Sequence, residues 1–364
     1  MNITAKITGI KYDVTLAKEL PAFRLNDFDI NNSPPACIIH DGKNAFAVSK
    51  WVSPKRTRSY PYERVYNTLN LSKKITIIPV VKDEGAAGDR DFLQWDSISL
   101  MSLLDVYVIL AYYTSASKNE NKIKRQKLDS AYILSKIKEI KQYHSSSLHW
   151  NLNELKTNLH DVIDKVKSSY RQMEKSTGIK FHGVDGLDNF KNEIGEDVSR
   201  FMKFSRGKAE KAQGREYVTI QPKENLSSKT KAKIPITNYL GGQYFFTVDE
   251  VSRSKENLKL IEKKHSKIDL LPAKGDIIDG VVKMILFSNL TDTQADGKEV
   301  NCKPVLELTS FQIKSSIDSN SSEITTARFF KENGVTASKA AFFRKLFKEA
   351  KANNFTVNIK QAND

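Results

Sequence analysis

The sequence predicts an α+β fold in which a mixed central sheet is flanked by helices. Two continuous apolar runs, at 74–81 and 106–113, have the length and composition of strands buried on both faces. The segment Asp41-Gly42-Lys43-Asn44 separates two more apolar segments, and an Asp-Gly pair supplies the positive φ that tight hairpin turns require. Strands and helices that alternate after an edge hairpin are typical of an α/β core.

The predicted core occupies residues 1–118. Its first strand is indicated by the alternation of Ile3, Ala5 and Ile7. The later elements, in chain order, are strands at 36–40 and 45–52, a helix at 60–71, a strand at 74–81, a helix at 91–105 and a strand at 106–113.

Two further regions follow this core. Residues 119–233 are expected to form a basic helical region that ends in a linker, because apolar residues recur at helical spacing within 152–173. Residues 234–364 form a second predicted α+β unit. Its expected strands are 243–248, 277–287 and 304–308, and its expected helices lie between 325 and 350, separated at Asn333-Gly334.

The charge of the chain indicates a polyanionic partner. Lys and Arg number 58 and Asp and Glu number 43, which gives a net charge of +15. Nucleic acid is the usual partner of a chain with such a surplus. No apolar run approaches the roughly 18 residues of a membrane span, and the N-terminal residues lack the apolar core of a signal peptide. We therefore expect a cytoplasmic protein with no membrane partner.

Several kinds of site are excluded by missing residues. Cys37 and Cys302 are too few for a disulfide scaffold or a cysteine-based zinc site. None of the six histidines forms a His-Glu-x-x-His pair. A phosphate-binding Gly-Lys-Ser/Thr loop is also missing, so no nucleotide cofactor is expected.

Carboxylates are concentrated at 82–96, just after an apolar strand and at the start of a predicted helix. Open α/β sheets bind ligands at the carboxyl ends of their strands. Since Mg²⁺ binds one or two carboxylates together with waters and phosphate oxygens, this cluster predicts a Mg²⁺ site. Helix capping and solvated loop positions are the alternative interpretation. The candidate metal ligands are Asp83, Glu84, Asp89, Asp91 and Asp96, and the candidate catalytic residues are Lys82, Asp89, Asp91, Glu84 and Lys50.

Two other segments are candidates for binding DNA. Segment 49–64 alternates basic and aromatic residues, which can pair with phosphates and stack on bases or sugars. The second of the C-terminal helices, which Thr336 is expected to cap, could serve as a recognition helix. A basic surface loop and an ordinary helical hairpin are the respective alternatives. The candidate DNA-binding residues are Lys55, Arg56, Arg58, Tyr60, Tyr62, Arg64, Lys339, Arg344 and Lys345.

Residues 36–118 resemble the core of the restriction-endonuclease-like, or PD-(D/E)XK-type, nucleases. The resemblance is carried by the hairpin, the mixed sheet with intervening helices, and the acidic residues beside Lys82. It implies Mg²⁺-dependent hydrolysis of phosphodiester bonds. The family pattern is an acidic residue followed by an (Asp/Glu)-x-Lys triplet on the next strand.

Three alignments of that pattern to the sequence remain open, and each departs from it. In two of them the triplet begins with valine, and in the third no triplet follows. They are Asp41 with Val48-Ser49-Lys50, Val80-Val81-Lys82 with Asp83 and Glu84 just after it, and Asp91 with the strand 106–113.

The chain as a whole resembles a type II restriction endonuclease. This resemblance implies a site-specific endonuclease that cuts double-stranded DNA, with the C-terminal unit serving for DNA recognition or dimerisation. A homodimer is expected, because cutting both strands of a symmetric site needs two active sites. The alternatives are a non-enzymatic nucleic-acid-binding protein and a defence-associated nuclease that acts on RNA.

Overall fold

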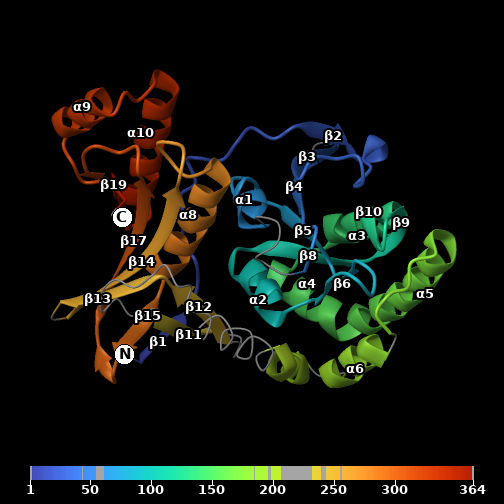
Figure 1. Cartoon of the computed structure of the whole chain (residues 1–364). Helices are drawn as coiled ribbons and strands as arrows, with labels where there is room; N and C mark the ends of the chain where they lie inside the picture. The colour runs from blue at the N-terminus through green and yellow to red at the C-terminus, as the bar shows by residue number, and fades with distance from the viewer. Residues whose placement is uncertain are drawn as a thin grey trace. The chain divides into compact units, whose positions relative to one another are not determined.

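The chain forms two compact units, which we call the terminal unit and the central unit (Figure 1). The terminal unit consists of Met1–Lys18 and Thr219–Asp364, and the central unit of Glu19–Val218. Helices and mixed sheets give an α+β fold, as the sequence predicts. The computed structural model describes residues 2–42, 44–54, 61–183, 185–195, 198–205, 232–238, 243–254 and 256–362.

This division differs from the expected one. The first strand does not belong to the α/β core, because Ile3–Ile7 pairs with strands far along the chain. The middle region is not a separate domain either, since Glu19–Val218 form one compact unit.

The central unit contains a five-stranded mixed sheet, in the order β2-β3-β4-β5-β8. Strands β3 and β4 are antiparallel and form the expected hairpin, whereas the other neighbours are parallel. Every residue of β5 and β8 is buried, so the two apolar runs are strands buried on both faces, as predicted. The bounds are β2 Ala22–Arg24, β3 Ala36–Asp41, β4 Asn44–Lys50, β5 Lys74–Pro79 and β8 Val106–Ala111.

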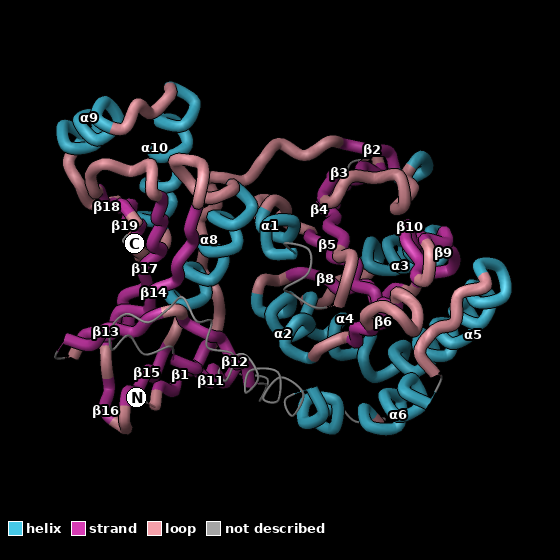
Figure 2. Tube along the Cα trace, in the orientation of Figure 1, coloured by secondary structure: helices cyan, strands magenta, loops and turns pink. Residues whose placement is uncertain are grey.

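Helices of the central unit pack against this sheet and against a separate hairpin (Figure 2). Helices α2, α3 and α4 contact β8, while α5 lies along the strand β9 described below. The bounds are η1 Leu25–Asp27, α1 Pro61–Tyr66, α2 Trp95–Leu103, α3 Ser130–Gln142, α4 Ser147–Asn153, the π-helical turn η3 Glu154–Asn158, α5 Leu159–Thr177 and α6 Asp185–Ile194.

Two local predictions in the central unit are wrong. The helix expected from residue 91 begins at Trp95, because Arg90–Phe92 (β7) pairs as a strand with Val81–Asp83 (β6). The basic segment expected to be helical from 118 forms the hairpin of Tyr113–Asn119 (β9) and Lys122–Leu128 (β10). In both segments the backbone forms a strand because it pairs with a neighbouring strand, and charge composition does not reveal such pairing.

The terminal unit contains two five-stranded sheets. The first has the order β12-β11-β1-β15-β16, so the N-terminal strand lies in its centre. The second has the order β13-β14-β17-β19-β18, in which β14, β17 and β19 are parallel. The bounds are β1 Ile3–Ile7, β11 Ala232–Asn238, β12 Gln243–Val248, β13 Glu250–Ser254, β14 Asn257–Ser266, β15 Thr291–Ala295, β16 Lys298–Glu299, β17 Asn301–Ser310, β18 Ile317–Asp318 and β19 Thr356–Gln361.

Three helices lie in the described part of this unit. The strand expected at 277–287 is the helix α8, Lys274–Ser288, so that prediction is wrong. A wholly apolar run fits either a buried helix or a buried strand, and the parallel neighbours β14 and β17 require a crossover helix between them. The expected helix pair is confirmed as α9, Glu323–Glu332, and α10, Ala337–Ala352. Gly334 takes a φ of +58° between them, and Thr336 caps α10.

Within the described part of the chain, no helix combines the length and the apolar composition needed to cross a membrane.

Candidate active site

The β13–β14 hairpin of the terminal unit brings two carboxylates together. Asp249 directly precedes β13, and Glu250 pairs with Ile261 across the hairpin. Continuing this antiparallel pairing by one residue places Asp249 opposite Glu262. The backbone N–H of Lys263 donates to Asp249 Oδ2 at 2.8 Å, which fixes the aspartate at this point.

Glu262 is held in the interior with one of its two oxygens engaged. Its side chain is 3% exposed, and Oε1 lies 3.0 Å from Lys264 Nζ and 2.8 Å from Lys283 Nζ. The other oxygen, Oε2, is buried and has no hydrogen-bond partner among the described residues. A buried acceptor without a donor costs roughly 1–3 kcal/mol, so a ligand that met this oxygen would be favourable.

Burial and one nearby carboxylate raise the energy of the charged form of Asp249. Burial is the main cause that raises the pKa of Asp249, and the negative charge of Glu262 raises it further. The N–H of Lys263 and the charges of Lys283 and Lys264 lower the pKa, but their effect is smaller. Like charges that are buried side by side are stabilised when a cation lies between them.

Lys264 lies on the same face of β14 as Glu262, because strand side chains repeat every two residues. Its ammonium lies 3.0 Å from Glu262 Oε1 and 3.8 Å from Asp279 Oδ2. Burial lowers the pKa of Lys264, but the charges of Glu262, Asp279 and Asp249 outweigh burial and raise it overall. Lys264 is thus a permanently charged group at neutral pH, with one-fifth of its side chain exposed.

Helix α8 covers this face of the sheet and contributes Asp279 and Lys283. These residues lie one turn apart on the helix and contact Lys264 and Glu262 respectively. Gly280 lies between them at the closest approach to the sheet. A Cβ atom at this position would be 2.6 Å from Leu306 Cδ1 and 3.4 Å from Lys264 Cε, so the missing side chain lets the helix approach.

These residues fit a divalent cation. Asp249 and Glu262 supply two carboxylates, and the buried Glu262 Oε2 has no competing donor in the described part of the chain. Mg²⁺ is commonly bound through one or two carboxylates, with waters and phosphate oxygens as its other ligands. No group of three or more His, Cys, Asp or Glu side chains that could hold a metal occurs among the described residues.

The sequence analysis missed this group of residues. Glu262-Lys263-Lys264 is an (Asp/Glu)-x-Lys triplet on a strand, and Asp249 precedes it on the neighbouring strand. This is the pattern of the resemblance that the sequence suggests for residues 36–118. The strand β14 was not predicted there, because charged side chains from Glu262 onwards mask the alternation of Leu258 and Leu260. The triplet alone does not identify the position, because Asp/Glu-x-Lys also occurs elsewhere in the chain, for example at Glu139-Ile140-Lys141 and Glu154-Leu155-Lys156.

The lysines predicted for catalysis in the central unit make local contacts. Lys50 Nζ donates to the carbonyl oxygens of Ile30 at 2.6 Å and Ser33 at 2.5 Å. Lys82 Nζ lies 2.9 Å from Glu84 Oε1. These two ammonium groups therefore hold neighbouring loops.

The carboxylates predicted to bind a metal lie on or next to the β6–β7 hairpin and at the start of α2, and each makes its own local contacts. Asp83 accepts from the Gly85 N–H at 2.9 Å and lies 2.9 Å from His182 Nδ1. Asp91 is buried on β7 and accepts from Ser53 Oγ at 2.9 Å. Asp96 is in the first turn of α2, while the backbone carbonyl of Asp89 accepts from the Glu84 N–H. They do not converge on one point as a group of three metal ligands in the described structure.

The predicted DNA-binding residues are placed only in part. Tyr62 is buried on α1, and Arg64 Nη1 donates to the Lys50 carbonyl at 2.6 Å. Arg344 lies on α10 and pairs with Glu323 at 2.7 Å, and Lys339 and Lys345 are also exposed on this helix. Lys55, Arg56, Arg58 and Tyr60 lie outside the described residues.

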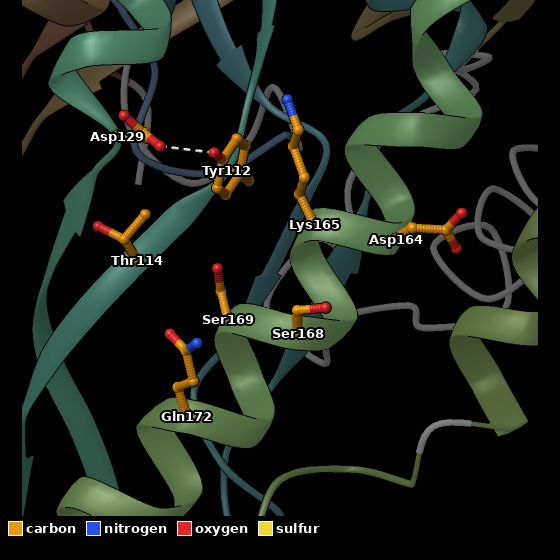
Figure 3. Close-up of a pocket in the computed structure, with 8 residues that line it drawn as sticks. All are labelled: Tyr112, Thr114, Asp129, Asp164, Lys165, Ser168, Ser169 and Gln172. Carbon is orange, nitrogen blue, oxygen red and sulfur yellow. Dashed lines mark hydrogen bonds between the residues drawn. The ribbon is translucent and has the colours of Figure 1, made fainter.

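A polar hollow of about 400 Å³ lies between α5 and β9 in the central unit (Figure 3). The Tyr112 hydroxyl donates to Asp129 Oδ2 at 2.5 Å, and Asp164 pairs with Lys191 at 2.6 Å. The carboxylates of its wall are therefore already engaged. The remaining wall is lined by Thr114, Lys165, Ser168, Ser169 and Gln172.

Comparison with protein-family models, curated proteins and solved structures found no match. Functional assignment for this chain therefore depends on the geometry of its own residues.

Proposed function

We propose that this protein is a Mg²⁺-dependent endonuclease that hydrolyses phosphodiester bonds of double-stranded DNA. The observation that supports this most strongly is the meeting of Asp249 with Glu262 and Lys264 on the β13–β14 hairpin. The buried Glu262 Oε2 adds to it, since it points to a ligand at this place.

The residues of the site have separate roles in this proposal. Asp249 and Glu262 would hold the cation. When bound, Mg²⁺ would activate a water and offset negative charge on the phosphodiester. Lys264 would bind the attacked phosphate and stabilise the charge that develops on it. It would not accept a proton, because the surrounding carboxylates raise its pKa. Asp279 and Lys283 are positioning residues, which hold Lys264 and Glu262 from the helix α8.

The substrate class is inferred from charge. A net charge of +15 favours a polyanion, and the arrangement of acid and (Asp/Glu)-x-Lys triplet is the one that the nuclease resemblance requires. Site-specific cleavage, as in a restriction system, is the form of the activity that we expect. The same residues could act on RNA, and the substrate test below includes it.

The test compares three purified proteins on plasmid DNA, with Mg²⁺ and with EDTA. Wild type is expected to give discrete fragments with Mg²⁺ and none with EDTA. Glu262→Gln should lose at least about 100-fold in cleavage rate, because one carboxylate at the cation position is gone. The matched control is Glu307→Gln, which makes the same change on the adjacent strand β17, at a buried carboxylate that pairs with Lys360 on the other face of the sheet.

Four outcomes would contradict the proposal. Full cleavage by Glu262→Gln would remove the site from the terminal unit. A fourth protein, Asp91→Asn, tests the central unit, and loss of cleavage in this variant alone would move the site there. Intact plasmid that shifts in mobility at low salt would favour the non-enzymatic binding protein. Cleavage of an RNA of the same sequence, with DNA left intact, would favour the RNA nuclease.

A further inference from the structure

The hairpin β9–β10 has an exposed face that consists of lysines and small polar residues. Residues that pair directly across antiparallel strands lie on the same face of a hairpin. All members of this face are exposed. The pairs are Lys127 with Ser115, Lys124 with Ser117, and Lys122 with Asn119.

The bond between Lys124 Nζ and Asn119 Oδ1, at 2.8 Å, agrees with this common face. A register shift between Lys124 and Lys127, where Arg125 takes a φ of +52°, accommodates the two intervening residues and keeps both lysines on the outer side. The three lysines thus form a row along one strand, next to a row of short side chains on the other strand.

This row of cations is not neutralised locally. None of Lys118, Lys122, Lys124, Arg125 and Lys127 forms an ion pair with a carboxylate among the described residues. Three lysines on the neighbouring helices do have carboxylate partners. Lys136 pairs with Glu139 and Glu154, Lys141 with Asp41, and Lys167 with Asp188. The hairpin is therefore a concentrated positive surface, because its five cations lie close together between residues 118 and 127.

The hairpin is anchored on its inner side. Ile123 and Leu128 are buried, and the Ile123 N–H donates to the Glu84 carbonyl at 3.1 Å. Gln126 Nε2 donates to the Asp83 carbonyl at 2.6 Å, and α5 packs along β9. A fixed surface of this kind loses little conformational entropy when it binds a partner.

We propose that this face of β9–β10 is a ribbon that contacts the backbone of duplex DNA. The inference rests on the proposed function, because it names where the substrate of that enzyme is held. A two-stranded ribbon fits the major groove, which is about 12 Å wide, and lysines contact the flanking phosphates while serines donate short hydrogen bonds. Residues 114–127 include no aromatic residue, so the face lacks the rings on which single-stranded bases stack.

The test measures binding of a 30-base-pair duplex without metal, in the Glu262→Gln background, across a range of KCl concentrations. Replacing Lys122, Lys124 and Lys127 by Ala should weaken binding at least about 10-fold near 100 mM salt. The slope of log K against log salt should fall by about 2–3, since each phosphate contact contributes about 0.9. The same three lysines replaced by Arg should bind as the parent protein does, which shows that charge at these positions carries the effect.

A second triple variant controls for net charge. Lys138, Lys156 and Lys175 are exposed on α3, η3 and α5, and their replacement by Ala removes the same charge from the central unit. This control should keep the parent slope to within about 1. Equal loss of slope in both Ala variants, or no loss in the ribbon variant, would overturn the ribbon. Tighter binding of a single strand than of the duplex would also overturn it.

Failure of the ribbon and failure of the nuclease proposal give different results. If wild type cuts DNA and the ribbon variant binds normally, the nuclease stands and the ribbon is wrong. If wild type never cuts but the ribbon variant binds weakly, the ribbon stands and the nuclease is wrong.

Discussion

Asp249 and Glu262 occupy positions that a stable protein without a ligand has little reason to use. Glu262 is buried and Asp249 is half-buried, and the charge of Glu262 adds to the burial that raises the pKa of Asp249. Lys264 and Lys283 offset part of this cost, since both ammonium groups contact Glu262 Oε1. Functional sites commonly carry such an electrostatic cost because the ligand relieves it.

Asp249→Asn should therefore stabilise the protein at neutral pH while removing cleavage. The raised pKa means that the folded state favours the protonated carboxyl. The stability that the protonated Asp249 gives to the folded state is fully present below the ordinary pKa of 3.8. It is lost as the pH rises through the raised pKa of the folded state. We expect the melting temperature at pH 7 to rise by about 2–4 °C, which corresponds to roughly 1 kcal/mol.

The gain of Asp249→Asn over wild type should shrink when the pH is lowered to 4, because the wild-type carboxyl then takes up a proton. The control is Asp292→Asn, an exposed aspartate whose φ of +46° asparagine also tolerates. It should leave the melting temperature within about 1 °C at both pH values. A lower melting temperature for Asp249→Asn at pH 7 would show that the carboxylate is not strained by its surroundings.

The helix α8 shows how a single element serves both packing and the site. Its apolar side chains, among them Ile277, Val281 and Ile285, are buried. Its polar residues Asp279 and Lys283 contact the charged pair on β14. Only a helix can present both sets, because residues that are four positions apart share one face.

Gly280→Ala should separate helix propensity from close packing. Alanine favours a helix over glycine by about 1 kcal/mol, but here the new Cβ would overlap Leu306 Cδ1, a fully buried side chain. We expect a net loss of about 1–3 kcal/mol in the free energy of unfolding and reduced cleavage, as α8 shifts away from Lys264. Urea denaturation together with the plasmid assay measures both.

Gly275 is the matched control on the same helix, since a Cβ there would meet nothing within 4 Å. Gly275→Ala should keep or raise the free energy of unfolding and should keep cleavage. Equal behaviour of the two alanine variants would show that the close approach at Gly280 does not matter.

At the scale of the whole molecule, the two units carry different parts of the proposed function. The terminal unit contains Asp249, Glu262 and Lys264, and the central unit contains the β9–β10 ribbon. The terminal unit is built from both ends of the sequence, because β1 lies between β11 and β15. In the proposed function, the terminal unit would therefore supply the chemistry and the central unit would bind the substrate.

The proposed function also predicts the oligomeric state of the protein. Cutting both strands of a symmetric DNA site requires two copies of the Glu262 site, so we expect a homodimer of the 41.3 kDa chain in solution. Sedimentation should give about twice that mass, and supercoiled plasmid should become linear without a lasting nicked form. A single-chain mass together with accumulating nicked circles would mean that one copy cuts one strand at a time.

The sequence by itself determined those elements whose signal is local. The apolar strands β5 and β8, the alternation of β1 and the Gly334 break between α9 and α10 all depend on neighbouring residues, and the structure agrees with each.

Only the tertiary structure decided the rest. Whether 277–287 is a strand or a helix, and whether 118–128 is a helix or a hairpin, depends on which distant segments pair with them. The meeting of Asp249 and Glu262 likewise depends on the antiparallel pairing of β13 with β14. Hydrophobic periodicity reports the environment of one segment, whereas strand partners and buried charge pairs are properties of two segments at once.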